Sequence, residues 1–266
     1  MIRTVVGLRP YRAEGFVVKA ERVGEKLVVH NYGHGGAGVT LSWGTAKLAA
    51  DEVRGVGGQE RFAVVGCGVS GLSLARVLQR RGGAVTIYAR ELPPETTSNV
   101  AGALWLPTSS YNPQRVSAAF PEQFRAACEV SNRAFQLMVG AEYGVRWMET
   151  YTVHTTEEEA ARELLGGARL YPETKLHRDA KRYFGAPLVR QFSTMLIEPS
   201  VYLNALLRDF HAAGGRVVVK ELRGREELAA LAEPVVFNCA GLGARALFAD
   251  EGLVPVRGQL EVLLPQ

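Results

Sequence analysis

The stretch Val64-Val65-Gly66-Cys67-Gly68-Val69-Ser70-Gly71 decides the fold of this chain. It follows an apolar segment expected to be a strand over residues 62–65, precedes an amphipathic helix, and is followed by a second apolar strand over residues 84–89. In such a βαβ unit the first glycine permits a tight turn, the second lets a pyrophosphate approach the backbone, and the third lets helix and strand pack closely. The free N–H groups and positive dipole end of the helix then face the phosphate. The stretch predicts a dinucleotide site, with an ordinary structural turn as the alternative.

Composition excludes several classes of protein. The chain has 266 residues, 47% of them hydrophobic, which is enough for one large domain or two interlocked domains. Its net charge is only +4, from 31 basic and 27 acidic residues that are interspersed, so no nucleic-acid partner is predicted. No stretch has the length of a membrane span, and no apolar core of a signal peptide follows Met1-Ile2-Arg3. These features predict no membrane association and a cytoplasmic location.

Cysteine and histidine usage gives no sign of a metal site. The three cysteines, Cys67, Cys128 and Cys239, have no Cys-x-x-Cys spacing, and their odd number argues against a disulfide framework. Cys67 and Cys239 lie at the ends of apolar strands, where we expect each to be a small buried hydrophobic residue. The histidines are scattered without ligand spacing, so no metal is predicted.

The order of expected elements indicates an α/β protein. Strands are predicted at residues 4–8, ended by Pro10, and at 16–18 and 27–30 around a turn at Gly24. A glycine-rich loop over residues 31–38 runs toward a helix at about residues 45–53, and a polar linker covers 55–60. Later segments predict helices at 121–139 and about 202–210, a short helix around 157–159, and strands at 146–154, 216–220 and 234–237. Residues 106–190 are more irregular and more antiparallel in character.

Four long motifs together are specific. They are residues 7–12 (GLRPYR), residues 30–44 (HNYGHGGAGVTLSWG), the glycine turn at 66–71, and residues 96–105 (TTSNVAGALW). This combination resembles the D-amino acid oxidase family of FAD-dependent flavoenzymes. The resemblance implies a Rossmann-type FAD-binding domain, formed by residues 1–110 and 191–250, with an interleaved, mainly antiparallel substrate domain formed by residues 111–190 and 251–266.

The order of the motifs differs from the family pattern. In the family the Gly-x-Gly-x-x-Gly unit opens the chain, and the segments that correspond to residues 7–12 and 30–44 close it. This chain therefore resembles a circular permutation of the family, which termini close together at the surface would permit. The segment at residues 257–262 resembles a strand that is followed in the family by the active-site lid. Nothing in the sequence corresponds to that lid. We therefore expect either a truncated chain or a partner, as a homo-oligomer or a complementing segment, that supplies it.

The resemblance also implies a reaction. The α-hydrogen of a D-amino acid passes as hydride to flavin N5, oxygen re-oxidises the flavin to give hydrogen peroxide, and the imino acid hydrolyses to a keto acid. Because the cofactor carries this chemistry, the resemblance implies no catalytic side chain. Arg9 is expected to bind the substrate carboxylate through its guanidinium fork, and the carbonyl of Gly36 to accept a hydrogen bond from the substrate amine.

The remaining residues implied by the resemblance hold FAD. The pyrophosphate is expected at Gly66, Gly68, Val69, Ser70 and Gly71, beside Thr96 and Thr97. The flavin ring is expected against Gly35, Gly38, Val39 and Thr40 on one side and Gly102, Ala103 and Leu104 on the other. Glu91 is favoured for the ribose and Arg90 for phosphate or adenine, with Leu222 and Ala240 beside the adenosine.

Two alternatives to the enzyme remain open at this point. One is an NAD-dependent dehydrogenase, and the other is a flavin-binding module without catalysis because the lid segment is missing. His34, between glycines, is expected to make a structural hydrogen bond in preference to acting as a base. Neither the side chain of the substrate nor the choice between oxidase and dehydrogenase is predicted.

Overall fold

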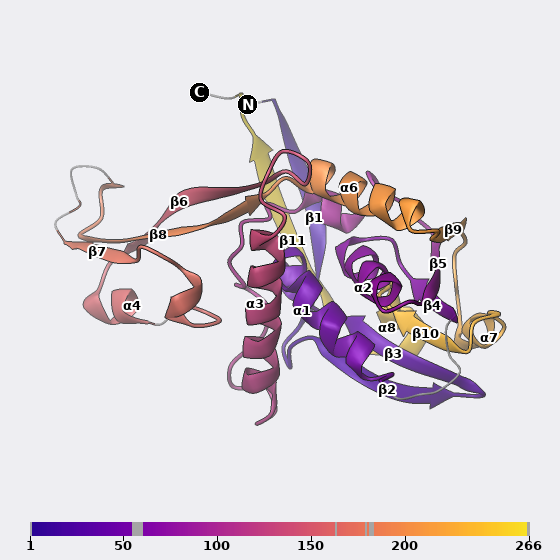
Figure 1. Cartoon of the computed structure of the whole chain (residues 1–266). Helices are drawn as coiled ribbons and strands as arrows, with labels where there is room; N and C mark the ends of the chain where they lie inside the picture. The colour runs from indigo at the N-terminus through magenta and orange to yellow at the C-terminus, as the bar shows by residue number, and fades with distance from the viewer. Residues whose placement is uncertain (1, 55–60, 163, 179, 181–183, 265–266) are drawn as a thin grey trace.

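A six-stranded sheet forms the centre of the protein (Figure 1). The structure is a computed structural model that describes residues 2–54, 61–162, 164–178, 180 and 184–264. The strand order is β2 (Val17–Val23), β3 (Lys26–Tyr32), β10 (Val235–Asn238), β4 (Arg61–Val65), β5 (Ala84–Ala89) and β9 (Arg216–Val219). Only β2 runs antiparallel to its neighbour, and the other pairs are parallel. The expected strands around Gly24 and both strands of the βαβ unit are thereby confirmed.

Helices cover both faces of this sheet. On one face, Val29, Val64 and Phe237 pack in a common core with residues of α1 (Gly38–Asp51), α2 (Val69–Arg80) and α6 (Pro199–Ala212). On the other face, Val28 and Val236 pack with α7 (Arg225–Ala229) and α8 (Gly243–Phe248). The strands are buried on both sides, which is why they read as continuous apolar runs instead of alternating ones.

Helix α1 begins seven residues before the predicted start at residue 45. Ten of its fourteen residues are buried, because α1 lies between the sheet, α2 and α3 (Phe120–Gln136). A Cβ on Gly44 would lie 2.0 Å from the carbonyl oxygen of Ala127, so α1 and α3 pack with their backbones almost in contact. A helix buried all round has no amphipathic period, and the sequence prediction therefore missed its first two turns.

A second, antiparallel part carries three strands in the order β6 (Val145–His154), β8 (Leu188–Ile197) and β7 (Lys175–Arg178). The short helix α4 (Glu157–Ala161) packs beside them, and Thr156 accepts a hydrogen bond from the Glu159 amide as its N-cap. Figure 1 shows this sheet extending away from the six-stranded one. The antiparallel character expected for this region is confirmed.

The first and last strands form a separate ribbon. Strand β1 (Arg3–Arg12) pairs antiparallel with β11 (Leu253–Val262), in a register that joins Arg3 to Val262. The prediction that Pro10 ends the first strand is wrong, because β1 continues two residues beyond it. A proline is tolerated there because β1 is an edge strand: it pairs with β11 on one side, and on the other side only the single bridge from Tyr11 to His34 is described.

The expected domain boundaries can be compared with the sheet to which each strand belongs. Residues 1–110 and 191–250 are predicted to form the FAD-binding domain, yet β1 pairs with β11 and β8 pairs with β6 and β7. These strands therefore lie outside the six-stranded sheet, since long-range pairing and not chain position decides sheet membership. The linker expected at residues 55–60 lies outside the described residues. Within the described residues, no helix is both long and apolar enough to span a membrane.

Candidate cofactor and substrate site

The three glycines of the turn between β4 and α2 differ in what surrounds them. Gly66 has φ of +108°, and a Cβ there would lie 2.5 Å from the carbonyl oxygen of Cys239, the residue that follows β10. A Cβ on Gly71 would lie 2.0 Å from the carbonyl oxygen of Gly66. Gly68 is extended, and the nearest atom to its missing Cβ is the Ser98 hydroxyl at 3.0 Å. The first and third glycines thus serve the turn and the helix packing, whereas the second leaves the backbone open to a ligand.

Ser98 is a site residue that the sequence analysis missed. Its hydroxyl accepts a hydrogen bond from the Val69 amide at 3.0 Å, at the N-terminus of α2. The hydroxyl of Thr96 instead donates to Asn99 Oδ1 at 2.7 Å, and Thr97 is exposed. The sequence held one signal for Ser98, since it is the third hydroxyl residue in the run 96–98. Only the turn of the short helix η2 (Thr97–Val100) decides which of the three faces α2.

The charged residues at the end of β5 form a cluster. Arg90 Nη2 lies 2.9 Å from Glu91 Oε1, and Arg90 Nη1 lies 3.2 Å from Glu221 Oε1. All three side chains are exposed at the carboxyl ends of β5 and β9, where a doubly wound sheet binds its ligand. Glu221 is a second carboxylate at this edge that the sequence analysis did not name. It precedes Leu222, which is buried in the core on the α7 and α8 face.

Ala240 lies at the same edge of the sheet. It follows β10, and its amide donates to Asn238 Oδ1 at 3.2 Å. The side chain of Ala240 packs against the cluster that contains Leu222. The structure therefore brings the two residues expected beside the adenosine into one region.

The second glycine-rich turn presents a carbonyl group. The Gly36 amide donates to the Ser109 carbonyl oxygen at 2.9 Å, and the Ala37 amide donates to the His34 carbonyl oxygen at 3.1 Å. Because a trans peptide is planar, the Gly36 carbonyl points opposite to the Ala37 N–H and away from His34. Gly35, with φ of +57°, allows this turn, and a Cβ there would lie 2.4 Å from the Ser109 carbonyl oxygen.

His34 is buried and serves the structure. Its Nε2 lies 3.1 Å from Thr45 Oγ1, and its ring stacks on Phe16 with centroids 5.7 Å apart. Burial lowers the pKa of His34 to about 4, so the imidazole is neutral at pH 7. This environment supports the structural role expected for His34.

Residues expected on the two sides of the flavin ring face each other. Thr40 Oγ1, in the first turn of α1, donates to the carbonyl oxygen of Leu104 at 3.4 Å. Val39 is buried beside it, and Gly38 is the first residue of the helix. Ala103 adopts φ of +50°, a strained value for a residue with a side chain, and its carbonyl accepts from the Ile197 amide. Gly102 is exposed next to it.

Arg9 lies on β1 between these two segments. Because side chains alternate along a strand, Gly7, Arg9 and Tyr11 share one face of β1. A Cβ on Gly7 would lie 2.5 Å from Val100 Cγ2, and Tyr11 forms a β-bridge with His34. Among the described residues, no carboxylate forms an ion pair with Arg9. The structure thus places Arg9 on a strand that contacts Val100 at one end and the turn at His34 and Gly35 at the other.

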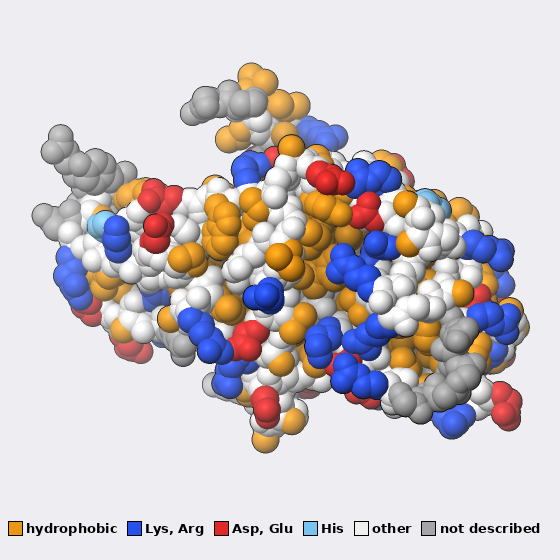
Figure 2. All heavy atoms as spheres, in the orientation of Figure 1, with side chains coloured by type: hydrophobic (Ala, Val, Ile, Leu, Met, Phe, Trp, Pro, Cys, Tyr) orange, Lys and Arg blue, Asp and Glu red, His pale blue; other side chains and the backbone are white. Residues whose placement is uncertain are grey.

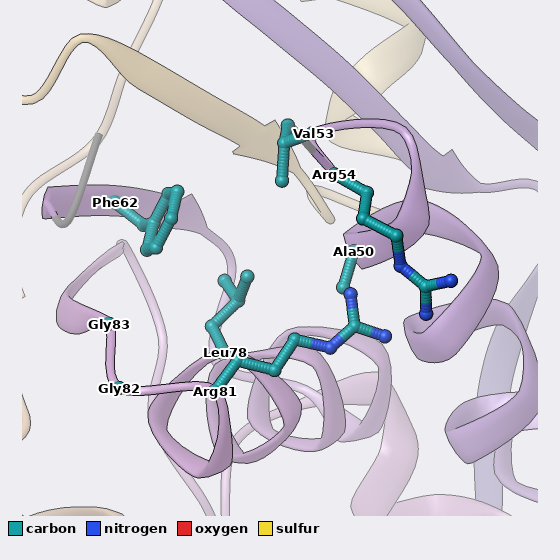
Figure 3. Close-up of a pocket in the computed structure, with 8 residues that line it drawn as sticks. All are labelled: Ala50, Val53, Arg54, Phe62, Leu78, Arg81, Gly82 and Gly83. Carbon is teal, nitrogen blue, oxygen red and sulfur yellow. The ribbon is translucent and has the colours of Figure 1, made fainter. Parts of the chain in front are cut away.

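A hollow elsewhere on the sheet is not this site (Figure 3). It has a volume of about 500 Å³ and is lined by Phe62, Leu78, Arg54 and Arg81 among others, at the amino ends of β4 and β5. None of the residues expected to bind cofactor or substrate lines it. Ligands of doubly wound sheets bind at the carboxyl ends of the strands, so the geometry favours the glycine turns.

Comparisons with known proteins agree with this geometry. The sequence profile of a family described as FAD-dependent oxidoreductases (DAO) matches residues 1–52 and 61–266. The chain is 35% identical to a D-amino-acid oxidase of Rubrobacter xylanophilus and 37% identical to one of Streptomyces coelicolor, each over 203 residues. Both alignments cover 75% of this chain and 58% of the relative. A D-aspartate oxidase of Homo sapiens is 31% identical over 210 residues, which are 77% of this chain and 60% of the relative.

One solved structure shows the same fold. Glycine oxidase from Geobacillus kaustophilus aligns with a TM-score of 0.50 and 20% sequence identity, over 74% of this chain and 60% of that one. The chain thus spans less than two thirds of the length of these relatives. Because the family profile covers nearly the whole sequence, the chain belongs to the DAO family of oxidoreductases, whose cofactor is FAD.

Proposed function

We propose that this chain holds FAD across its two glycine turns and binds the carboxylate of an amino acid beside the flavin through Arg9. The observation that carries the proposal is the Arg9 guanidinium, which has no ion-pair partner among the described residues and comes from a strand that contacts Val100 and the turn at Gly35. The residues present fit the cofactor. Gly68 leaves the approach to α2 open, and the N-termini of α1 and α2 offer positive dipole ends to the ring and the pyrophosphate.

The proposed reaction is the oxidation of a D-amino acid to the imino acid, which water hydrolyses to a keto acid. FAD, when bound, would supply the acceptor for the hydride of the substrate Cα and the route by which the electron pair reaches oxygen as hydrogen peroxide. The chain itself orients the substrate. Arg9 would take the carboxylate in a bidentate pair, and the Gly36 carbonyl would accept from the amine, so that Cα faces the cofactor. An NAD-dependent dehydrogenase is not favoured, because the family profile is that of FAD enzymes.

The test compares two arginines on the same ribbon. Arg9 and Arg257 lie on neighbouring strands but on opposite faces, since Arg257 is the cross-strand partner of Leu8. With a panel of D-amino acids, we expect peroxide from the FAD-loaded wild type and from Arg257→Leu. Arg9→Leu should retain the yellow cofactor and lose turnover. Unchanged turnover in Arg9→Leu would refute the role of Arg9, and bound FAD without any turnover would identify a flavin-binding module.

We further propose that a complementing polypeptide segment packs on the ribbon β1–β11 and on strand β6. Each of these strands pairs with a described strand along one edge, and along the other edge only isolated bridges are described, at Tyr11 of β1 and Val145 of β6. Figure 2 shows the end of the ribbon standing out from the body, with hydrophobic side chains gathered on it. Leu264 is 69% exposed there, and Trp147 and Tyr151 on β6 are each 41% exposed. Exposed apolar strands at a free edge are typical of a surface that another chain covers. Light scattering and sedimentation would distinguish a homo-oligomer from a monomer that needs a separate segment.

We also propose that the chain is a circular permutation of the family order. If the parallel strands are counted from β4, then β9-β5-β4-β10-β3 has the doubly wound order 3-2-1-4-5, which supports the proposal. The ends of the ribbon also lie together, since the Ile2 amide donates to the Val262 carbonyl oxygen at 2.7 Å. A variant that starts at residue 61 and joins residue 266 to residue 1 through a short flexible linker should fold and bind FAD with unchanged affinity. Loss of folding in that variant would count against the proposal.

A cytoplasmic location is a further proposal. Its support is that Cys67, Cys128 and Cys239 are all free and buried, as suits a reducing compartment. Burial raises the pKa of Cys67 and Cys128 to about 12, so neither is a reactive thiolate at neutral pH. Cell fractionation would test the location.

A further inference from the structure

Two glycines face each other at the centre of the ribbon. Gly7 on β1 and Gly258 on β11 are direct cross-strand partners. Glycine weakens a strand, and within one it often marks a close approach of another group. Since directly paired residues of an antiparallel ribbon share a face, the two missing side chains leave one flat area on the face that carries Arg9.

Each half of this flat area is covered by a different group. Over Gly7 lies Val100, whose Cγ2 would be 2.5 Å from a Cβ at that position. Over Gly258 lies the side chain of Arg9. A Cβ on Gly258 would be 2.9 Å from Arg9 Nε, 3.1 Å from Nη2 and 3.2 Å from Cζ. The guanidinium therefore lies across β11, over the same glycine pair that Val100 covers.

We propose that Gly258 is a positioning residue for the substrate carboxylate. Its missing side chain lets the Arg9 guanidinium lie flat across the ribbon, where its free fork is held beside the segment from Val100 to Leu104. This inference rests on the proposed role of Arg9 and adds the residue that sets the direction of the guanidinium. The Arg9 side chain is flexible and exposed, so a methyl group at position 258 would displace the guanidinium without disturbing backbone packing.

The test is Gly258→Ala in the FAD-loaded protein, with benzoate as a probe that has a carboxylate and no oxidisable amine. We expect calorimetric titration to show a dissociation constant raised about tenfold, because a displaced fork loses one of two charge-assisted hydrogen bonds. With a D-amino acid substrate, KM should rise by a similar factor and exceed the change in kcat. The FAD spectrum and the thermal midpoint should stay as in the wild type. Gln259→Ala, on the opposite face of β11, is the matched control and should change neither constant.

A double-mutant cycle separates this inference from the proposed function. In an Arg9→Lys background there is no guanidinium to displace, so Gly258→Ala should change benzoate affinity less than about twofold there. The coupling free energy of the cycle should therefore differ clearly from zero and be about as large as the effect of Gly258→Ala alone. If Arg9→Lys weakens benzoate binding and Gly258→Ala does not, the role of Gly258 is wrong and that of Arg9 stands. If benzoate affinity is unchanged by Arg9→Lys, the carboxylate role of Arg9 fails and the inference fails with it. Equal effects of Gly258→Ala in both backgrounds would also overturn it.

Discussion

The glycines of the first turn should separate folding from cofactor binding. We compare Gly68→Ala with Gly71→Ala, which add the same methyl group three residues apart. At Gly71 the added carbon would lie 2.0 Å from the Gly66 carbonyl oxygen, which cannot move away by a side-chain rotation because it belongs to the backbone. At Gly68 it would meet only the Ser98 hydroxyl at 3.0 Å, in an extended conformation that any residue adopts.

The two substitutions should differ in how much folding stability and how much FAD affinity they cost. Overpacking costs about 1–3 kcal/mol or more, and alanine recovers about 1 kcal/mol in a helix, so Gly71→Ala should lose about 2 kcal/mol of stability. For a chain of this size that loss lowers the thermal midpoint by about 4–8 °C. At Gly68 the N-cap penalty of alanine and the lower entropy of its unfolded chain nearly cancel, leaving a change within about 0.5 kcal/mol. Its methyl group would instead lie in the path of the pyrophosphate and weaken FAD binding by about tenfold or more.

The assay measures both quantities on each variant. Thermal unfolding of the FAD-free protein reports stability, and quenching of FAD fluorescence on titration reports affinity. We expect Gly71→Ala to lower the thermal midpoint and Gly68→Ala to raise the dissociation constant of FAD at an almost unchanged midpoint. If Gly68→Ala destabilises the FAD-free protein as much as Gly71→Ala, or binds FAD as the wild type does, the separate tasks of the two glycines are refuted.

Three further predictions concern the buried polar groups. Tyr202→Phe should lower the free energy of unfolding in urea by about 1–3 kcal/mol, because it removes the acceptor of the 2.6 Å hydrogen bond from the buried Trp43 Nε1; a change below 0.5 kcal/mol would contradict this. Burial acts to raise the pKa of Asp250, but the Arg12 guanidinium at 2.8 Å lowers it below the ordinary value. The ion pair therefore stabilises the folded protein at pH 7, and this stabilisation is lost below about pH 4, as the pH falls through the folded-state pKa. The stability gap between wild type and Asp250→Asn should therefore shrink toward pH 3, and a constant gap would count against the ion pair. Burial lowers the folded-state pKa of His34 to about 4, so the unfolded chain binds a proton first and stability should fall from about pH 6.5 to 4; His34→Asn should lack this part of the pH slope in chemical unfolding.

Local sequence was sufficient for the βαβ unit. The apolar runs of β4 and β5, the glycine spacing and the amphipathic α2 are all signals between neighbouring residues, and the strand bounds agree with the prediction to within one residue. The tasks of Gly66 and Gly71 also followed from the motif. Their surroundings, a backbone carbonyl within 2.5 Å of each missing Cβ, agree with it.

Contacts between distant parts of the chain required the tertiary structure. Helix α1 is buried on all sides and so has no apolar period, and only its packing shows that it begins at Gly38. Ser98 and Thr96 are both hydroxyl residues of one short run, and the turn of the backbone decides which of them faces α2.

The sequence by itself determined the kind of ligand and the family, because glycine turns and long motifs are local patterns that backbone geometry dictates. Only the tertiary structure decided that β1 pairs with β11, since register between strands about 250 residues apart depends on packing and not on local periodicity. That pairing places the Arg9 guanidinium over Gly258. A motif identifies a residue that could bind a carboxylate, and the fold fixes the direction in which its guanidinium points.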